Sequence, residues 1–172
     1  MQSGDDVILQ KMNRGYTVKE FISLVTRFKK KLPSLTLSTD VIIGFPTETI
    51  EQFNQTIDLL QTIKPDIINI TRFSARPLTA AKTMKGRIPT HVVKERSKKI
   101  TGICSKISSE KNQEHIGKTY IVLVTEKGKH ETYTGRTENY KQVVIKEPVT
   151  IGDFVYAEII DVAPIYLVGK LI

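Results

Sequence analysis

The stretch TDVIIGFPTET, residues 39–49, decides the fold of the first half of this chain. A β-branched apolar run ends at Gly44, where the missing Cβ permits either a sharp turn or the close approach of a ligand. Pro46 has no N–H group and cannot extend a central strand. Thr49, with Gln52 three residues later, predicts the start of a helix. Ligands of α/β folds bind at the carboxyl ends of buried strands, so we expect part of a ligand here.

The segments around this stretch alternate between helix and strand patterns. The predicted elements are a helix after Thr17 that ends before Pro33, a strand at 35–43, a helix from Thr49 to Pro65, a strand at 67–73, and a helix from about residue 90 to residue 115. This order predicts parallel strands joined by right-handed crossovers. Two parallel strands cannot close a barrel and leave a sheet edge unpaired. We therefore expect this α/β half to be the C-terminal part of a larger barrel.

The second half of the chain changes character at Gly117. Strand patterns dominate from there on, at residues 119–125, 131–137, 142–146, 154–161 and 165–171. Five short strands separated by turn residues predict a small closed or partly open β-barrel. We expect two domains, one at 1–116 that includes the long helix and one at 117–172.

Composition is that of a globular protein that binds an anionic partner. The chain has 172 residues, 40% of them hydrophobic, and a net charge of +8. Ten Lys or Arg residues oppose three Glu between Lys82 and Lys118, which indicates either contact with nucleic acid or a solvated helix face. No apolar run approaches the roughly 20 residues of a membrane helix, and the first residues do not resemble a signal peptide. We expect a cytoplasmic monomer with no membrane contact.

Metal chemistry is not predicted for the residues of this chain. Cys104 is the single cysteine and cannot by itself hold a zinc ion or an iron–sulfur cluster. It occupies an apolar position of a helical pattern, which favours a small buried hydrophobe over a catalytic thiol. His91, His115 and His130 are too scattered to form a metal site.

Four motifs in order resemble a known family. They are QSG at 2–4, MNRGYT at 12–17, the 39–49 stretch, and FSARPLTAA at 73–81. Together they resemble the C-terminal half of the radical S-adenosylmethionine (SAM) methylthiotransferases that modify tRNA. The region after residue 117 resembles the TRAM domain of that family, an OB-like RNA-binding barrel. The lysine-rich helix is most similar to the archaeal and eukaryotic branch, which methylthiolates threonylcarbamoyladenosine beside the anticodon. The resemblance thus implies the C-terminal part of a partial TIM-like radical SAM barrel followed by a TRAM barrel.

This resemblance also implies cofactors. In the family, a C-x-x-x-C-x-x-C triplet binds a [4Fe–4S] cluster that cleaves S-adenosylmethionine, and an N-terminal domain holds a second cluster. Neither cysteine set is present here, so we expect a fragment that does not perform the radical step alone. Two alternatives stay open: a free-standing RNA-binding protein, and a cofactor-binding α/β protein without an RNA role.

The family's cofactor-facing positions carry over to six residues. They are Ser3, Arg14, Asp40, Gly44, Phe45 and Pro46. Residues 44–46 lie beside the adenine in the family, or they form a tight turn with no ligand. Arg14 can clamp a carboxylate or form a structural ion pair. Asp40 lies in an apolar strand, so we expect a buried carboxylate that pairs with Arg14 or contacts a cofactor hydroxyl.

Basic and aromatic residues are the candidates for tRNA contact. Arg76, in the loop after the second strand, suits a phosphate or the carboxylate of the modified base. The candidate phosphate contacts are Lys94, Arg96, Lys98, Lys99, Lys118, Lys127, Lys129, Arg136 and Lys141. Tyr133 and Tyr140 are interleaved with them and can stack on unpaired bases.

Overall fold

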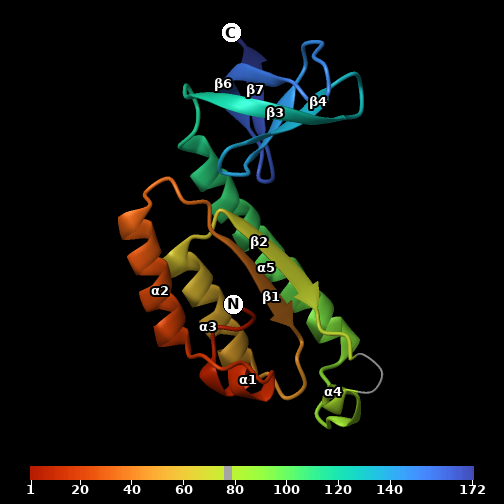
Figure 1. Cartoon of the computed structure of the whole chain (residues 1–172). Helices are drawn as coiled ribbons and strands as arrows, with labels where there is room; N and C mark the ends of the chain where they lie inside the picture. Colours follow the sequence, from red (N-terminus) through yellow and green to blue (C-terminus); the bar gives the residue numbers. More distant parts are fainter. Residues whose placement is uncertain (76–78) are drawn as a thin grey trace. The chain divides into compact units, whose positions relative to one another are not determined.

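The computed structural model describes residues 1–75 and 79–172 (Figure 1). They form two compact units, one of Met1–Pro33 with Leu37–Cys104 and one of Ser34–Thr36 with Ser105–Ile172. The division falls inside the longest helix, α5 (Thr90–Gln113). The domain boundary near residue 116 was predicted from the change to strand patterns, whereas this division follows compactness. The predicted boundary therefore stays a prediction.

A two-stranded parallel sheet organises the first unit. Strand β1 (Ser38–Ile43) pairs with β2 (Ile67–Arg72) along their whole length, as predicted. β1 begins three residues later than expected, because the N–H of Leu37 donates instead to the Asp66 carboxylate at 2.9 Å. The first residues of the chain lie along the other edge of β1, where the Ile42 N–H donates to the Gln2 carbonyl at 3.0 Å.

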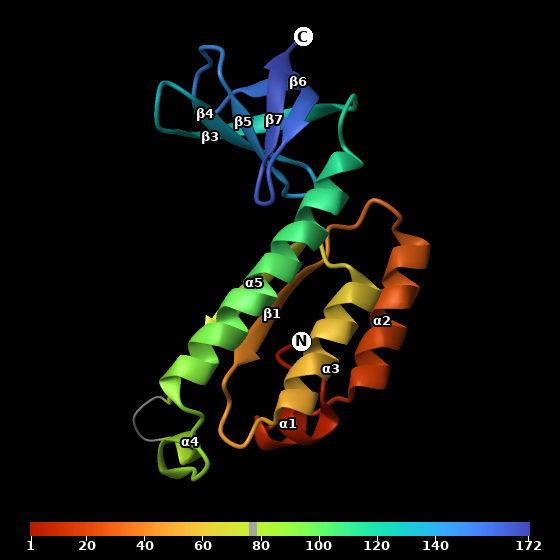
Figure 2. The ribbon, with the colours of Figure 1, turned by 180° about the vertical axis from the view of Figure 1, so that it is seen from behind.

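Helices cover one face of this sheet. Five helices are present in the described part: α1 (Asp6–Lys11), α2 (Val18–Lys31), α3 (Ile50–Ile63), α4 (Ala80–Thr83) and α5. Figure 2 shows α3 and α5 in front of the strands, whereas Figure 1 shows the strands uncovered from the opposite side. Thr39, Val41 and Ile43 alternate with more exposed residues along β1, so their side chains form the buried face. The short helices α1 and α4 were not predicted, since six and four residues carry too little periodicity.

Both predicted capping boxes are present. The Thr17 hydroxyl accepts from the Glu20 N–H and the Glu20 carboxylate accepts from the Thr17 N–H, which starts α2. The same reciprocal pair joins Thr49 and Gln52 at the start of α3. The second cap begins α3 directly after the turn that follows β1, and it fixes where that turn ends.

The second unit contains a closed five-stranded barrel, as the strand pattern predicts. Its strands are β3 (Thr119–Lys127), β4 (Tyr133–Thr137), β5 (Gln142–Ile145), β6 (Phe154–Val162) and β7 (Leu167–Leu171), in the order β3-β4-β5-β7-β6. β5 and β7 are parallel, and the other pairs are antiparallel. The core is made by Val122, Val143, Ile145, Ala157, Ile159 and Leu167, all fully buried. Closure leaves no long sheet edge exposed.

The cap at Thr49 provides a stability test. Thr49→Ala removes the oxygen that accepts from the Gln52 N–H, so we expect a loss of about 1 kcal/mol in the free energy of unfolding. Thr49→Ser keeps the oxygen and retains the stability. Urea unfolding followed by far-UV circular dichroism measures both, with Gln61→Ala, exposed on α3, as the control. An equal loss in the Ser variant would show that the capping oxygen is not the cause.

Candidate functional site

The turn after β1 is built around Gly44. Its φ of +77° is in the left-handed region, and an added Cβ would lie 2.7 Å from Cγ2 of Val93 on α5. Of the two roles that the sequence allows for this glycine, the structure therefore shows a sharp turn closely packed against a helix side chain. Phe45, 4% exposed, points inward with its ring edge-on to Phe73 at 5.0 Å between centroids.

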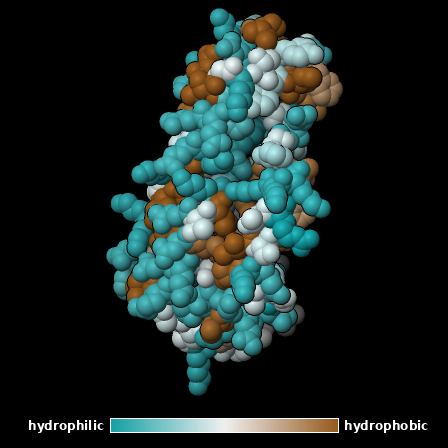
Figure 3. Space-filling model, turned by 90° about the vertical axis from the view of Figure 1, so that its left-hand side faces the viewer, coloured by the Kyte–Doolittle hydropathy of each residue, from teal (hydrophilic) through white to brown (hydrophobic). Residues whose placement is uncertain are grey.

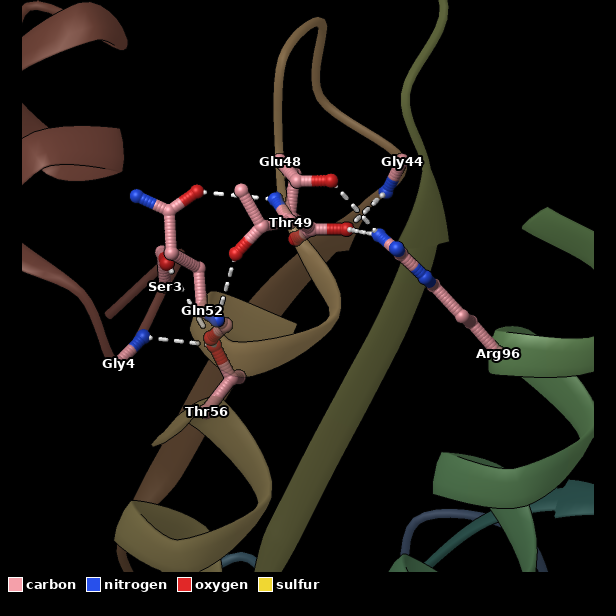
Figure 4. Close-up of polar contacts among 8 residues, drawn as sticks. All are labelled: Ser3, Gly4, Gly44, Glu48, Thr49, Gln52, Thr56 and Arg96. Carbon is pink, nitrogen blue, oxygen red and sulfur yellow. Dashed lines mark hydrogen bonds and ion pairs between the residues drawn. The ribbon is translucent and has the colours of Figure 1, made fainter. Parts of the chain in front are cut away.

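A buried ion pair holds this turn in place (Figure 4). The carboxylate oxygen Oε2 of Glu48 accepts from the Gly44 N–H at 3.1 Å and from Nη1 of Arg96 at 2.7 Å. Nη1 of Arg96 also donates to the Glu48 carbonyl at 3.1 Å. The pair therefore joins the end of β1, the start of α3 and the N-terminal third of α5. Arg96 is buried, so it is not the phosphate contact that the sequence predicted; that prediction was wrong.

Burial dominates the electrostatics of this pair. Desolvation raises the pKa of the Glu48 carboxyl, while the Gly44 N–H and the Arg96 guanidinium oppose the increase. A raised folded-state pKa gives stability that is present at low pH and is lost as pH rises through it. Arg96 limits that loss because it stabilises the charged carboxylate.

The ion pair yields a pH-dependent prediction. Arg96→Met leaves the Glu48 carboxylate buried without a counterion, so its pKa rises further and the unfolding free energy falls by about 3–5 kcal/mol at pH 7. The loss should be smaller at pH 4, where Glu48 is protonated, and the double variant with Glu48→Gln should recover stability at pH 7. Urea titrations at both pH values measure this, with Lys94→Met, exposed on the same helix, as the control. Equal losses at pH 4 and pH 7 would contradict the assignment.

The uncovered face of the sheet carries polar side chains. Asp40 is exposed on this face, and its Oδ1 accepts from Nδ2 of Asn69 on β2 at 2.9 Å. The expected buried carboxylate is therefore wrong: β1 is covered on one face only, and Asp40 points to the other. No ion pair joins Asp40 to Arg14 within residues 1–75. Arg14 is exposed and lines a cavity of about 560 Å³ together with Ile42, Thr71 and Phe73.

A second cavity lies at the carboxyl ends of the strands. It has a volume of about 350 Å³, and Gly44 and Pro46 form part of its wall. Three cations line it, namely Arg72, Lys82 and Arg87. Nε of Arg72 donates to the Ser97 hydroxyl at 3.3 Å, and Nη2 of Arg87 donates to the Lys82 carbonyl at 3.0 Å. None of these three cations was a predicted site residue, although Arg72 is the last residue of β2 and Lys82 and Arg87 follow that strand in the sequence, as Arg76 does. Arg76 itself lies outside the described residues.

Ser3 is part of the packing beneath the sheet rather than its open face. It is 1% exposed, and its Oγ lies 3.5 Å from Oγ1 of Thr56 (Figure 4). The Gly4 N–H donates to the same Thr56 oxygen at 2.8 Å. Of the six predicted cofactor residues, only Arg14, Asp40, Gly44 and Pro46 thus reach a cavity wall or the open face of the sheet.

The predicted RNA contacts divide into exposed and buried side chains. Lys94, Lys98 and Lys99 are exposed on α5, and Nζ of Lys99 donates to Oδ1 of Asn54 at 3.2 Å. On the barrel unit, the exposed candidates are Lys118, Lys127, Lys129 and Tyr140, and the half-buried ones are Tyr133 and Arg136. Lys141 is buried, and its Nζ donates to Oδ1 of Asn112 at 2.9 Å. The prediction of a phosphate contact at Lys141 is therefore wrong.

The two units differ in charge. Residues 1–104 carry seventeen Lys or Arg and nine Asp or Glu, whereas residues 105–172 carry nine of each. The whole net charge of +8 therefore belongs to the α/β unit and the first part of α5. The barrel unit is formally neutral.

Cys104 has the character of a core residue, as predicted. It is 5% exposed, and burial raises its pKa to about 11. No group of three His, Cys, Asp or Glu side chains in the described ranges is arranged to hold a metal ion.

This pKa predicts low thiol reactivity. At pH 8 we expect the folded chain to react with a disulfide reagent at least ~100-fold more slowly than the urea-unfolded chain, because the thiolate is the nucleophile. Stopped-flow absorbance measures the rate, and no other cysteine contributes to it. Similar rates in the two states would contradict the burial of this thiol.

Comparison with known proteins agrees with these two units. The model of the radical SAM superfamily matches residues 1–60, and the model of the TRAM domain matches residues 113–172. A probable threonylcarbamoyladenosine tRNA methylthiotransferase of Pyrococcus abyssi is 43% identical over 99% of this chain. This chain is similar to the tRNA methylthiotransferases over nearly its whole length. The predicted resemblance is thereby confirmed.

Two further relatives match the same share of this chain. A probable threonylcarbamoyladenosine tRNA methylthiotransferase of Archaeoglobus fulgidus is 42% identical over 99% of the chain. A tRNA-2-methylthio-N(6)-dimethylallyladenosine synthase of Aquifex aeolicus is 37% identical, also over 99%. The chain spans about 40% of the length of these relatives. Among the helices that the structure describes, none has the length and apolarity needed to cross a bilayer.

Proposed function

We propose that this chain provides part of the S-adenosylmethionine site and the tRNA-binding surface of a methylthiotransferase that modifies threonylcarbamoyladenosine next to the anticodon. The observation that carries this proposal is the collinear match of the whole chain to the archaeal enzymes named for that reaction. The order of a radical SAM segment and a TRAM domain supports it. The transferase would act in the cytoplasm, where tRNA is modified.

The α/β unit supports the larger barrel in this proposal. Its sheet is covered by helices on one face only, and Asp40, Asn69 and Thr71 are exposed on the other. No third strand pairs with β2 among the described residues. Further parallel strands of a larger barrel would enclose the open face as the inside of a TIM-like barrel.

The open face fits S-adenosylmethionine in its chemistry. Arg14 offers a guanidinium to the cofactor's carboxylate, and Asp40 and Asn69 offer hydrogen-bonding groups to its ribose hydroxyls. The turn at Gly44 presents strand-end backbone beside a cavity. The residues do not fit an iron–sulfur cluster, because the chain has one cysteine and that cysteine is buried. A purely RNA-binding role is the second candidate, and the match of residues 113–172 to the TRAM domain supports it.

The distribution of charge indicates where the phosphates of tRNA would bind. The exposed cations at the end of the sheet and on α5 lie in the unit that carries the whole net charge. We therefore place the main phosphate contacts at Arg72, Lys82, Arg87, Lys94, Lys98 and Lys99. The barrel lysines Lys127 and Lys129 are secondary, since their unit is neutral.

Binding of tRNA at several salt concentrations tests this placement. The affinity should fall steeply with salt, because phosphate contacts release counterions. Lys82→Glu with Arg87→Glu should weaken binding at least about tenfold and reduce the slope of log affinity against log salt by about two. Lys127→Glu with Lys129→Glu is the matched charge change on the barrel and should have a smaller effect. A flat salt response, or a larger effect of the barrel pair, would contradict the proposal.

A further inference from the structure

The outer face of the barrel exposes large apolar side chains where β3 and β6 pair. Phe154 is 71% exposed, Tyr156 is 59% exposed and Ile121 is 50% exposed. Figure 3 shows, from one side, hydrophobic side chains in brown at the surface of the barrel. Single exposed hydrophobic residues are common on protein surfaces, so what matters is whether these three are neighbours.

The strand register makes them neighbours. Ile121 lies opposite Tyr156, and Leu123 lies opposite Phe154, in the antiparallel pair of β3 and β6. Directly opposed residues in such a pair point to the same face, with Cβ atoms about 4.5–5.5 Å apart. The core is made by the alternate residues, including Val122 and Ala157, so these four outward side chains do not fill it.

A cation extends this surface on β4. Arg136 lies opposite Leu123, and its guanidinium carbon is 5.1 Å from the centroid of the Tyr140 ring, which is 70% exposed. Its Nη1 donates to the Tyr140 carbonyl at 3.5 Å, and no carboxylate of the described residues forms an ion pair with it. We call this surface the platform; it comprises Ile121, Leu123, Phe154, Tyr156, Arg136 and Tyr140.

We propose that the platform stacks the unpaired bases of an RNA strand. Flat exposed rings bind bases of any sequence, because every base has a π-face. Arg136 supplies a positive charge at the edge of the rings, without a carboxylate partner, and it complements a backbone phosphate. The neutral charge of the barrel unit means that stacking, rather than counterion release, supplies most of its affinity. This inference rests on the RNA-binding role proposed above and specifies which part of the RNA the barrel contacts.

A tryptophan probe tests the contact directly. The chain contains no tryptophan, so Phe154→Trp introduces one fluorophore into the platform. Titration of this full-length variant with a twelve-nucleotide oligouridine, which has no stable secondary structure, should quench its fluorescence through stacking. Ile165→Trp is the matched control, since Ile165 is 79% exposed in the turn at the opposite end of β6, and it should not be quenched. Equal quenching of both, or of neither, would overturn the proposal.

Affinity measurements give a second test. Phe154→Ala with Tyr156→Ala should weaken oligouridine binding at least about tenfold and leave the slope against salt unchanged, because no phosphate contact is removed. Phe154→Tyr and Ile165→Ala should bind like the unmodified chain. Circular dichroism checks that each variant is folded. Unchanged affinity of the double alanine variant would overturn the proposal.

The outcomes also separate this inference from the proposed function. Binding of tRNA without any binding of oligouridine would overturn the platform and leave the tRNA role intact. Quenching at residue 154 together with a flat salt response of tRNA binding would support the platform and contradict the placement of the phosphates. A dimer in sedimentation that the double alanine variant dissociates, with unchanged RNA affinity, would overturn the proposal by showing a second copy on this face.

Discussion

The candidate site depends on the buried ion pair between the Glu48 carboxylate and the Arg96 guanidinium. One carboxylate oxygen receives the Gly44 N–H and the Arg96 guanidinium, and it thereby connects a strand end, a helix start and the helix that packs on both. Both charged groups are buried, so either one would be left unpaired and away from water if its partner moved. The position of the turn is therefore coupled to that of α5. The ion pair therefore also fixes the part of the cavity wall that Gly44 and Pro46 form.

The two units differ in which parts of their sheets are left uncovered. The barrel pairs every strand with two neighbours and needs no covering helix. The α/β unit leaves one face of its sheet uncovered, and polar or cationic residues gather on that face and at its strand ends. The functional candidates of the first unit therefore lie on the uncovered sheet face and at the strand ends. Those of the barrel are outward-facing side chains that take no part in its core.

Local patterns predicted much of this fold. The Thr-x-x-Glu and Thr-x-x-Gln spacings identified both capping boxes, because every group involved lies within one helical turn. The site depended on distant partners and was harder to predict. Arg96 lies 48 residues from Glu48, so nothing in its lysine-rich surroundings indicated burial. The burial of Lys141 was equally hard to predict, since its partner Asn112 lies 29 residues away in the sequence. The prediction for Asp40 is wrong because apolar residues on β1 indicate burial of both faces, whereas the structure covers only one of them.

The place of β7 in the barrel constrains how the protein is made. This strand comes last in the sequence, yet it lies between β5 and β6 and is parallel to β5. During synthesis the cylinder therefore cannot close until β7 has left the ribosome, whereas the α/β unit by then already has both of its strands. A nascent chain that still lacks β7 keeps open edges on β5 and β6, and unpaired strand edges of this kind promote aggregation.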